Sequence, residues 1–391
     1  MLIERLELAG FRSYHALAVD FPPGPQVVVG PNAAGKTNLL EALLVLGTGR
    51  SHRAASDQEM IGWDADFARL VASVVAAAIS DPGSPPAAVP HELEVVLART
   101  GPGRKRLRVN GVARRATALA ATLPVVLFSP EDMLLVVGSP GLRRSVLDGL
   151  LVQLEPEAAA VLGTYARALV QRNNLLRALR DGNAAAAELR FWSETIARDG
   201  GRIVGWRRQT LAALAGPLAA AHAEIAPEEA RLELRYVTNA EPAGAEDAEQ
   251  ALRRRLAETA EKEMWNGATL VGPHRDDLSF WLGERELAGF GSRGQQRSAI
   301  LALKLGQLEL IGRRAGRPPL LLLDDVFSEL DPERRAHLVR RIGELPQAFV
   351  TTTTLDDLDP ALVAAATAWR AGGGRLERLA ATRGALGAAA R

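Results

Sequence analysis

The segment GPNAAGKT at residues 30–37 decides the fold class of this 391-residue chain. It fits the pattern G-x-x-x-x-G-K-[ST], between the apolar stretch QVVVG and the helix-like stretch TNLLEALLVL. In such a strand-loop-helix unit, backbone N–H groups of the loop and the helix N-terminus face nucleotide phosphates. Lys36 can reach the β and γ phosphates, and Thr37 can hold Mg²⁺. The segment therefore predicts an α/β fold with a phosphate site. The alternative is an ordinary Gly-rich turn between a strand and a helix.

A second segment, PLLLLDDVFSELD at residues 319–331, supplies the carboxylates that a phosphate loop needs. A parallel strand would deliver Asp324 to the carboxyl edge of the sheet, where nucleotide binds. We expect Asp324 to act on Mg²⁺, directly or through water, and Asp325 to orient or deprotonate the attacking water. Lys36, Asp324 and Asp325 are thus the predicted catalytic residues. A strand that stops at a solvated acidic turn is the alternative, which loses weight beside a phosphate loop.

Composition excludes several classes of protein. The chain has 47 basic and 46 acidic residues, a net charge of +1 and no cysteine. Disulfides, thiolate metal sites and cysteine nucleophiles are therefore absent, and any polyanion must meet a local patch or a surface made on assembly. The N-terminus lacks the pattern of a signal peptide, and no apolar run approaches the ~20 residues of a membrane helix. These features predict a cytoplasmic protein without membrane association.

The chain alternates between sheet-like and helical character. Residues 1–150 read as strands broken by turns, with an Asn110-Gly111 hairpin signal. Residues 151–264 carry apolar side chains at helical spacing, although Gly200-Gly201 should weaken or bend this stretch. Residues 265–391 return to strands and helices. We therefore expect one αβ unit, split into 1–150 and 265–391, with a mainly helical lobe inserted at 151–264.

The segment GSRGQQR at residues 291–297 opens another predicted helix. It offers backbone N–H groups and Ser292 to a phosphate but no lysine, so it cannot be a second complete nucleotide site. The alternative, from the loop alone, is a Gly-containing hairpin exit that caps a helix.

The order of the phosphate loop, helical insertion, GSRGQQR, LLLLDD and SELD (residues 328–331) resembles the ATP-binding-cassette ATPases, whose signature loop is LSGGQQR. The resemblance implies an ATPase head with a mixed, largely parallel core sheet and an antiparallel β subdomain. It implies ATP-dependent homodimerisation, in which the signature loop of one head covers the γ-phosphate held by the other, and a D-loop that ends in Asp331. The signature residues acting in trans would be Ser292, Arg293, Gly294 and Gln295.

Nearly the whole chain resembles the RecF family of bacterial recombinational-repair proteins. The motifs that carry the resemblance are LELAGFRSY, GPNAAGKTNLLEAL, FSPEDMLLVVGSPGLRRSVLD, QRNNLL, GPHRDDL, GSRGQQR and LLLDDVFSELD, in this order. The resemblance implies a weak ATPase that binds double-stranded DNA with ATP near single-strand gaps. It also implies work with RecO and RecR to load the recombinase RecA, in DNA repair and replication.

By the same resemblance, Arg12 of GFRSY reaches the bound nucleotide; a solvated strand-end arginine is the alternative. The expected ATP-binding residues are Gly30, Pro31, Asn32, Ala33, Ala34, Gly35, Lys36, Thr37, Asn38 and Arg12.

Three positions depart from the wider cassette pattern. Asp325 stands where glutamate is usual, so slow hydrolysis is expected. VTTTT replaces the γ-phosphate-sensing histidine, which makes a hydroxyl among Thr351–Thr354 the candidate substitute. No Q-loop glutamine is evident, and Glu131 or Asp132 is the candidate for its coupling role.

The basic segment RKRLR at residues 104–108 is the candidate DNA contact, through Arg104, Lys105, Arg106 and Arg108. Such residues would neutralise phosphates without reading sequence, although a solvated sheet face is an equal alternative. Basic and aromatic residues are not interleaved, which favours duplex over single-strand binding. In GPHRDDL (residues 272–278) we expect a turn that pairs its own charges.

The alternative function is the ATPase subunit of a membrane transporter. The long separation between Lys36 and Ser292 argues against it. A nucleotide kinase or small-molecule ATPase would leave the signature and SELD segments unexplained.

Overall fold

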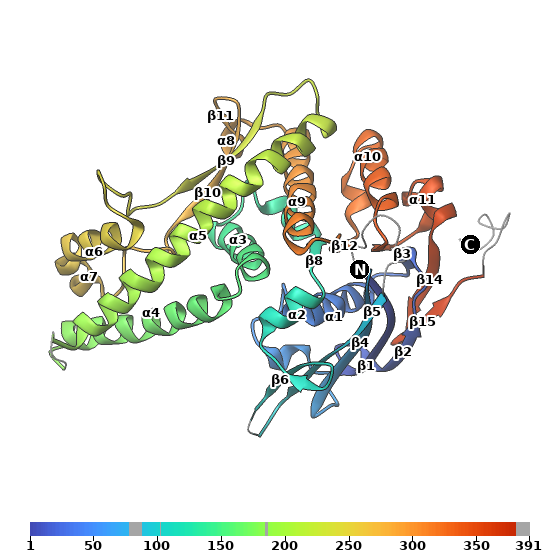
Figure 1. The fold of residues 1–391 in the computed structure, drawn as a ribbon, viewed down its shortest axis with the longest axis horizontal. Helices are drawn as coiled ribbons and strands as arrows, with labels where there is room; N and C mark the ends of the chain where they lie inside the picture. Colours follow the sequence, from blue (N-terminus) through green and yellow to red (C-terminus); the bar gives the residue numbers. More distant parts are fainter. Residues whose placement is uncertain (78–87, 102, 184–186, 381–391) are drawn as a thin grey trace. The chain divides into compact units, whose positions relative to one another are not determined.

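The computed structural model describes residues 1–77, 88–101, 103–183 and 187–380 (Figure 1). The chain forms two compact units: Met1–Met133 with Gln307–Arg391, and Leu134–Gly306. The first unit is thus built from both ends of the sequence. The second unit is wider than the predicted lobe of residues 151–264, because flanking segments pair and pack with the helices inside it.

The core sheet of the first unit is mainly parallel. Its strand order is β15-β14-β3-β13-β12-β8, and only the β14–β15 pair is antiparallel. All residues of β12 are buried, as expected for a leucine-rich strand in the middle of a parallel sheet. The carboxyl ends of β3, β13 and β12 therefore meet at one edge. The strands are β3 (Gly24–Val29), β8 (Val125–Phe128), β12 (Leu320–Asp324), β13 (Gln347–Thr352), β14 (Thr367–Gly372) and β15 (Arg375–Arg378).

A second, antiparallel sheet in the same unit has the order β2-β1-β4-β5-β6-β7. The predicted hairpin is present, since Asn110 and Gly111 join β6 to β7 with positive φ angles of 52° and 74°. The strands are β1 (Leu2–Phe11), β2 (Tyr14–Asp20), β4 (Phe67–Ala77), β5 (Ala88–Ala98), β6 (Lys105–Val109) and β7 (Val112–Ala113). Together the two sheets give the mixed α/β head with an antiparallel subdomain that the sequence predicts.

Helix α1 (Lys36–Thr48) contacts strands of both sheets, which explains why most of its residues, including all of its leucines, are buried. Leu39, Leu40 and Leu43 have no exposed surface. The helix is fixed on both sides, so its N-terminal turn is held at the edge where β3 ends. The other helices and 3₁₀ turns of this unit are η1 (Asp57–Met60), α2 (Ala116–Thr122), η3 (Val326–Glu329), α10 (Pro332–Gly343), η4 (Leu355–Asp357) and α11 (Pro360–Ala365).

The second unit is mainly helical, with α4 packed along α5 (Figure 1). A small sheet of order β11-β10-β9 joins it, because β9 pairs with β10 from beyond residue 265. Leu147, Leu211 and Leu278 pack together and tie α3, α5 and β10 into one core. The elements are α3 (Pro140–Leu154), α4 (Ala158–Arg180), α5 (Ala187–Ile225), β9 (Leu232–Val237), α6 (Ala248–Glu258), α7 (Ala260–Asn266), β10 (Asp277–Leu282), β11 (Arg285–Glu286) and α8 (Leu287–Phe290). Two further elements run across the limits between the units, η2 (Pro130–Leu134) and α9 (Arg293–Ala315).

The predicted weakening at Gly200-Gly201 is wrong, because α5 runs unbroken through both glycines. A Cβ atom at Gly201 would lie 2.8 Å from backbone atoms of Glu249 at the start of α6. The small residue is there to let α6 approach closely, and tertiary packing outweighs the low helix propensity of glycine.

Among the described residues, none of the helices combines the length and apolar character needed to cross a bilayer.

Candidate nucleotide site

The predicted phosphate loop joins β3 to α1 at the carboxyl edge of the core sheet. Ala33 and Gly35 have φ angles of 64° and 101°, so the loop turns through the left-handed region just before the helix. Lys36 is buried over this loop and its Nζ donates hydrogen bonds to the carbonyl oxygens of Gly30 at 2.7 Å and Pro31 at 3.0 Å. The ammonium group is thus held above the N–H groups that would face a phosphate.

Asp324 lies at the end of β12 and is 6% exposed. Its Oδ1 accepts hydrogen bonds from Thr37 Oγ1 at 3.1 Å and from Thr351 Oγ1 at 2.7 Å. The structure therefore brings together the two residues that the sequence assigned to the metal. A carboxylate and a hydroxyl are the hard oxygen ligands that Mg²⁺ prefers, with phosphate and water oxygens completing its shell. Among the described residues no cluster of three or more His, Asp or Glu forms a metal cage.

Asp325 follows in the left-handed conformation, with a φ angle of 52°. Its N–H lies 3.1 Å from Thr351 Oγ1 and 3.3 Å from the carbonyl oxygen of Thr351. Burial raises the pKa of Asp325, Lys36 opposes this rise, and the neighbouring Asp324 adds to it. Burial lowers the pKa of Lys36, whereas the negative charges of Asp325 and Asp324 act to raise it. Opposite charges therefore share the edge where phosphate chemistry would occur.

A buried carboxylate, Glu41, lies close to the phosphate loop and was not among the residues predicted from the sequence. Glu41 of α1 has no exposed surface and accepts two hydrogen bonds from Arg12, at 2.7 and 2.9 Å, with others from Arg53 at 2.8 Å and Ser51 at 2.5 Å. Burial acts to raise the pKa of Glu41, but the hydrogen bonds from Arg12, Arg53 and Ser51 outweigh it and lower that pKa to about 2. A lone glutamate inside the apolar run NLLEALLVL was the available signal.

Arg12 is not a solvated strand-end arginine. It has a φ angle of 52°, and its third nitrogen donates to the carbonyl oxygen of Glu59 at 2.7 Å. Glu41 and Glu59 thus fix the guanidinium beside the first turn of α1, where Asn38 Nδ2 donates to Ser13 Oγ at 2.8 Å.

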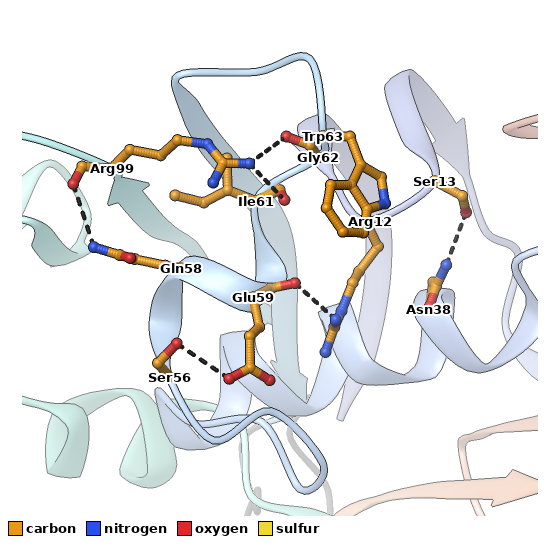
Figure 2. A pocket seen from close by; sticks show the side chains of 10 residues that line it. All are labelled: Arg12, Ser13, Asn38, Ser56, Gln58, Glu59, Ile61, Gly62, Trp63 and Arg99. Atoms are coloured by element: carbon orange, nitrogen blue, oxygen red, sulfur yellow. Dashed lines mark hydrogen bonds between the residues drawn. The ribbon is translucent and has the colours of Figure 1, made fainter.

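A pocket of about 570 Å³ opens at this point (Figure 2). Its wall comes from the turn that follows β1, the first turn of α1, the segment around η1 and the residue that follows β5. The lining residues are Arg12, Ser13, Asn38, Ser56, Gln58, Glu59, Ile61, Gly62, Trp63 and Arg99. The pocket has the size of a small-molecule site and adjoins the phosphate loop.

The four threonines at the end of β13 and just beyond it, Thr351–Thr354, have different environments. Thr351 is bound to Asp324, and Thr352 Oγ1 donates to the carbonyl oxygen of Thr354 at 2.7 Å. Thr354 Oγ1 accepts from a backbone N–H in η4. Thr353 is exposed and stays the candidate for the sensor role.

The D-loop and Q-loop candidates also differ in their surroundings. Asp331 caps α10, accepting from the N–H of Arg334 at 3.0 Å, and also pairs with the Arg334 guanidinium. Asp132 is buried and accepts from the N–H of Ser129 at 2.8 Å, whereas Glu131 is exposed. Glu131 therefore stays the candidate for the coupling role.

The signature segment lies in the second unit. Ser292 and Gln295 exchange side-chain hydrogen bonds with each other's N–H groups, at 3.0 and 3.2 Å, and so cap α9. Ser292 and Arg293 are nevertheless exposed. The helix-capping alternative is therefore correct for the local structure. The cap does not bury Ser292 or Arg293, so both side chains remain accessible to a phosphate.

The four predicted DNA contacts do not share one environment. Lys105 pairs with Asp57 at 2.7 Å, and Arg108 pairs with Glu94 at 3.0 Å. Arg104 and Arg106 are exposed on the same strand region.

The expectation that GPHRDDL pairs its own charges is wrong. Asp277 binds Arg143 of α3 at 2.7 Å, Asp276 accepts from Tyr236 of β9 at 2.5 Å, and His274 lies 2.7 Å from Tyr165 of α4. Its charged and polar side chains hold separate elements of the second unit together.

This combination of a phosphate loop, an acidic strand end and a signature helix defines a class of ATPase heads. Residues 2–366 match the family model described as "RecF/RecN/SMC N terminal domain". A solved Smc head domain from Pyrococcus furiosus shares the fold, with a TM-score of 0.50 at 18% identity, covering 96% of this chain and 95% of that one.

More specifically, the chain belongs to the RecF family. It is 40% identical to the "DNA replication and repair protein RecF" of Herpetosiphon aurantiacus, over 92% of this chain and 95% of that protein. The protein of the same description from Heliobacterium modesticaldum is also 40% identical, over 97% of this chain and 99% of that protein. A solved RecF structure, "RecF-ATPrS in RecFOR pathway", has a TM-score of 0.85 at 27% identity and covers 97% of this chain and 98% of that one. The transporter alternative finds no support in these matches.

Proposed function

We propose that this protein is an ATP-dependent, duplex-DNA-binding ATPase of recombinational repair and replication. The observation that carries the proposal is the contact between Thr37 and Asp324 beside Lys36, in a chain of the RecF family. The relatives are described as DNA replication and repair proteins, and a solved relative is described as a RecF-ATP complex in the RecFOR pathway.

ATP would lie with its phosphates on the loop of residues 30–37 and its nucleoside in the adjoining pocket. Thr37 and Asp324 would hold Mg²⁺, which neutralises charge on the β and γ oxygens when bound. Lys36 supplies a further positive charge through its Nζ, which lies 2.7 Å from the carbonyl oxygen of Gly30. Asp325 would orient the attacking water. Its side chain is one methylene shorter than glutamate and its backbone is held by Thr351, which supports slow hydrolysis.

The exposed signature loop supports an ATP-dependent homodimer. Ser292 and its neighbours offer N–H groups and a hydroxyl to a phosphate, but the segment has no lysine and cannot hold a nucleotide by itself. The phosphate must therefore be held mainly by another site. In the dimer this phosphate would be the γ-phosphate on Lys36 of the other copy, with Asp331 close to the same interface. ATP would then be the link between dimer closure and DNA binding.

Arg104 and Arg106 are the stronger candidates for contact with DNA phosphates. Lys105 and Arg108 would first have to leave their carboxylate partners, Asp57 and Glu94. Contact through arginines to phosphates suits a protein that acts at any gap, because it reads no sequence. Cooperation with RecR and RecO, and through them with RecA, is part of the same proposal, as is a cytoplasmic location.

The test measures oligomeric state by light scattering and binding to gapped and plain duplex DNA, with and without ATP and Mg²⁺. The native chain should dimerise and bind DNA only with ATP. Lys36→Met should not bind ATP and should therefore neither dimerise nor bind DNA. Ser292→Arg should bind ATP and yet stay monomeric.

Ser292→Ala is the matched control, because it removes the helix cap without adding bulk or charge. It should weaken α9 by about 1 kcal/mol and still dimerise with ATP, but less tightly than the native chain, because the backbone N–H groups of the loop remain while the hydroxyl contact is lost. A native chain that stays monomeric and indifferent to DNA in every nucleotide state would overturn the proposal.

A further inference from the structure

Trp63 is the most unusual side chain of the nucleotide pocket, because it is 96% exposed. It stands on the segment that follows η1 and lines the pocket shown in Figure 2. Indole is a large apolar surface that folding normally buries, as it does for Trp369, which is 5% exposed. Because Trp63 also lines a pocket, its indole is placed to contact whatever occupies that pocket.

The polar side chains of the pocket wall are already occupied. Arg99 donates from Nη2 to the carbonyl oxygen of Gly62 and from Nε to that of Ala65, both at 2.9 Å. Gln58 Nε2 donates to the carbonyl oxygen of Arg99 at 3.3 Å. These bonds fix the backbone on both sides of Trp63, and they leave the indole face as the main surface offered to a ligand.

The pocket lies next to the phosphate loop, because its lining includes Asn38 of the first turn of α1. Asn38 lines it and lies two positions after Lys36, and Arg12 closes the same side through its bonds to Glu41. A ligand with phosphates on the loop and a flat aromatic group in the pocket would therefore meet Trp63. About 570 Å³ is enough for a nucleoside.

We propose that Trp63 is the base-stacking residue of the nucleotide site, with its indole covering one face of the purine of ATP. The inference rests on the proposed ATP site but adds a binding residue that the phosphate-loop chemistry does not require. Stacking is tolerant of the base, since every base has a π face, so Trp63 sets affinity for the nucleoside rather than for one particular purine.

The experiment compares ATP with inorganic tripolyphosphate, which offers the phosphates without a base. Binding is measured by calorimetry and by tryptophan fluorescence, at concentrations where the protein is monomeric. In Trp63→Ala the affinity for ATP should fall about tenfold, the size of one base–aromatic stack, and the affinity for tripolyphosphate should not change. Trp63→Phe should recover most of the loss.

Trp265→Ala is the matched control, because Trp265 is 81% exposed and lies in the other unit. ATP should quench the fluorescence of the native chain and of Trp265→Ala, and this quenching should disappear in Trp63→Ala.

Native ATP affinity in Trp63→Ala would overturn the inference and leave the proposed ATPase intact. An equal loss of tripolyphosphate binding would also overturn it, by assigning Trp63 to the structure of the loop. So would normal ATP binding with lost DNA binding or dimerisation, which would assign the indole to DNA or to the second subunit. A native chain that binds neither ligand would overturn both proposals.

Discussion

The hydroxyl of Thr37 donates a hydrogen bond of 3.1 Å to Oδ1 of Asp324, across 287 positions of sequence. Thr37 lies in the first turn of α1, and Asp324 ends β12. Strand β13 lies between β3 and β12, and all three are parallel. Their carboxyl ends meet at one edge, and this topology brings together the two residues that we propose hold Mg²⁺.

Asp324→Asn tests that relationship. The amide oxygen can still accept from Thr37 and Thr351, but the negative charge toward Mg²⁺ is lost. We expect phosphate release at saturating ATP and Mg²⁺ to fall by roughly 100-fold, since metal-assisted charge stabilisation is worth several kcal/mol. Asp356→Asn, in η4 of the same unit, is the control and should retain the native rate. An unchanged rate in Asp324→Asn would remove this residue from the metal site.

Thr351→Val removes the hydroxyl that bonds Asp324 at 2.7 Å and lies 3.1 Å from the N–H of Asp325. The change leaves buried polar groups without their partner, which costs about 1–3 kcal/mol of unfolding free energy. We also expect slower hydrolysis with little change in the affinity for ATP, because Thr351 positions the aspartates and does not face the phosphates itself. Urea denaturation and phosphate release measure the two effects. Thr351→Ser should restore both, and a Ser variant as impaired as Val would contradict a role for the hydroxyl.

Glu41→Gln leaves Arg12 and Arg53 without their shared countercharge. The carboxylate is fully buried, while the two arginine side chains are 21% and 34% exposed, so solvent compensates part of the loss. We expect the free energy of unfolding at neutral pH to fall by about 1–3 kcal/mol and the affinity for ATP to fall with it, because Arg12 is released from the pocket wall. Glu7→Gln, at an exposed ion pair, should change stability by less than about 0.5 kcal/mol.

The contribution of Glu41 should also depend on pH in a defined direction. Folding lowers the pKa of this carboxyl from 4.5 to about 2, so the stabilisation is fully present above about pH 4.5 and is lost as the pH falls toward 2. The difference in unfolding free energy between the native chain and Glu41→Gln should therefore shrink as acid is added below pH 4.5. A difference that stays constant through this range would show that the charge of Glu41 is not what stabilises the cluster.

Arg104→Ala combined with Arg106→Ala tests the DNA contacts. We expect weaker binding to duplexes of every sequence and a decrease of about 2 in the slope of log affinity against log salt, because two phosphate contacts are lost. Arg5→Ala is the control from the same sheet, since Arg5 is held by Glu7 and Asp20. A native salt slope in the double variant would place the DNA elsewhere on the protein.

The sequence alone determined the parts of this protein that depend on local pattern. The phosphate loop, the acidic strand end and the signature helix each need a particular residue order within a dozen positions, so the order of residues is enough to name them. The leucines of β12 indicated a buried parallel strand, and Asn110-Gly111 indicated a hairpin. Even the fold class followed, because a strand, a phosphate loop and a helix in this order have few three-dimensional solutions.

The tertiary structure decided everything that depends on a partner distant in sequence. It alone revealed that Glu41 is buried against Arg12 and Arg53, that Thr351 bonds Asp324, and that Trp63 stands exposed beside the pocket. The same reason explains the errors at Gly200-Gly201 and in GPHRDDL. A glycine pair weakens an isolated helix, and neighbouring charges pair in an isolated turn, but packing against α6 and bonds to α3, α4 and β9 outweigh those local preferences.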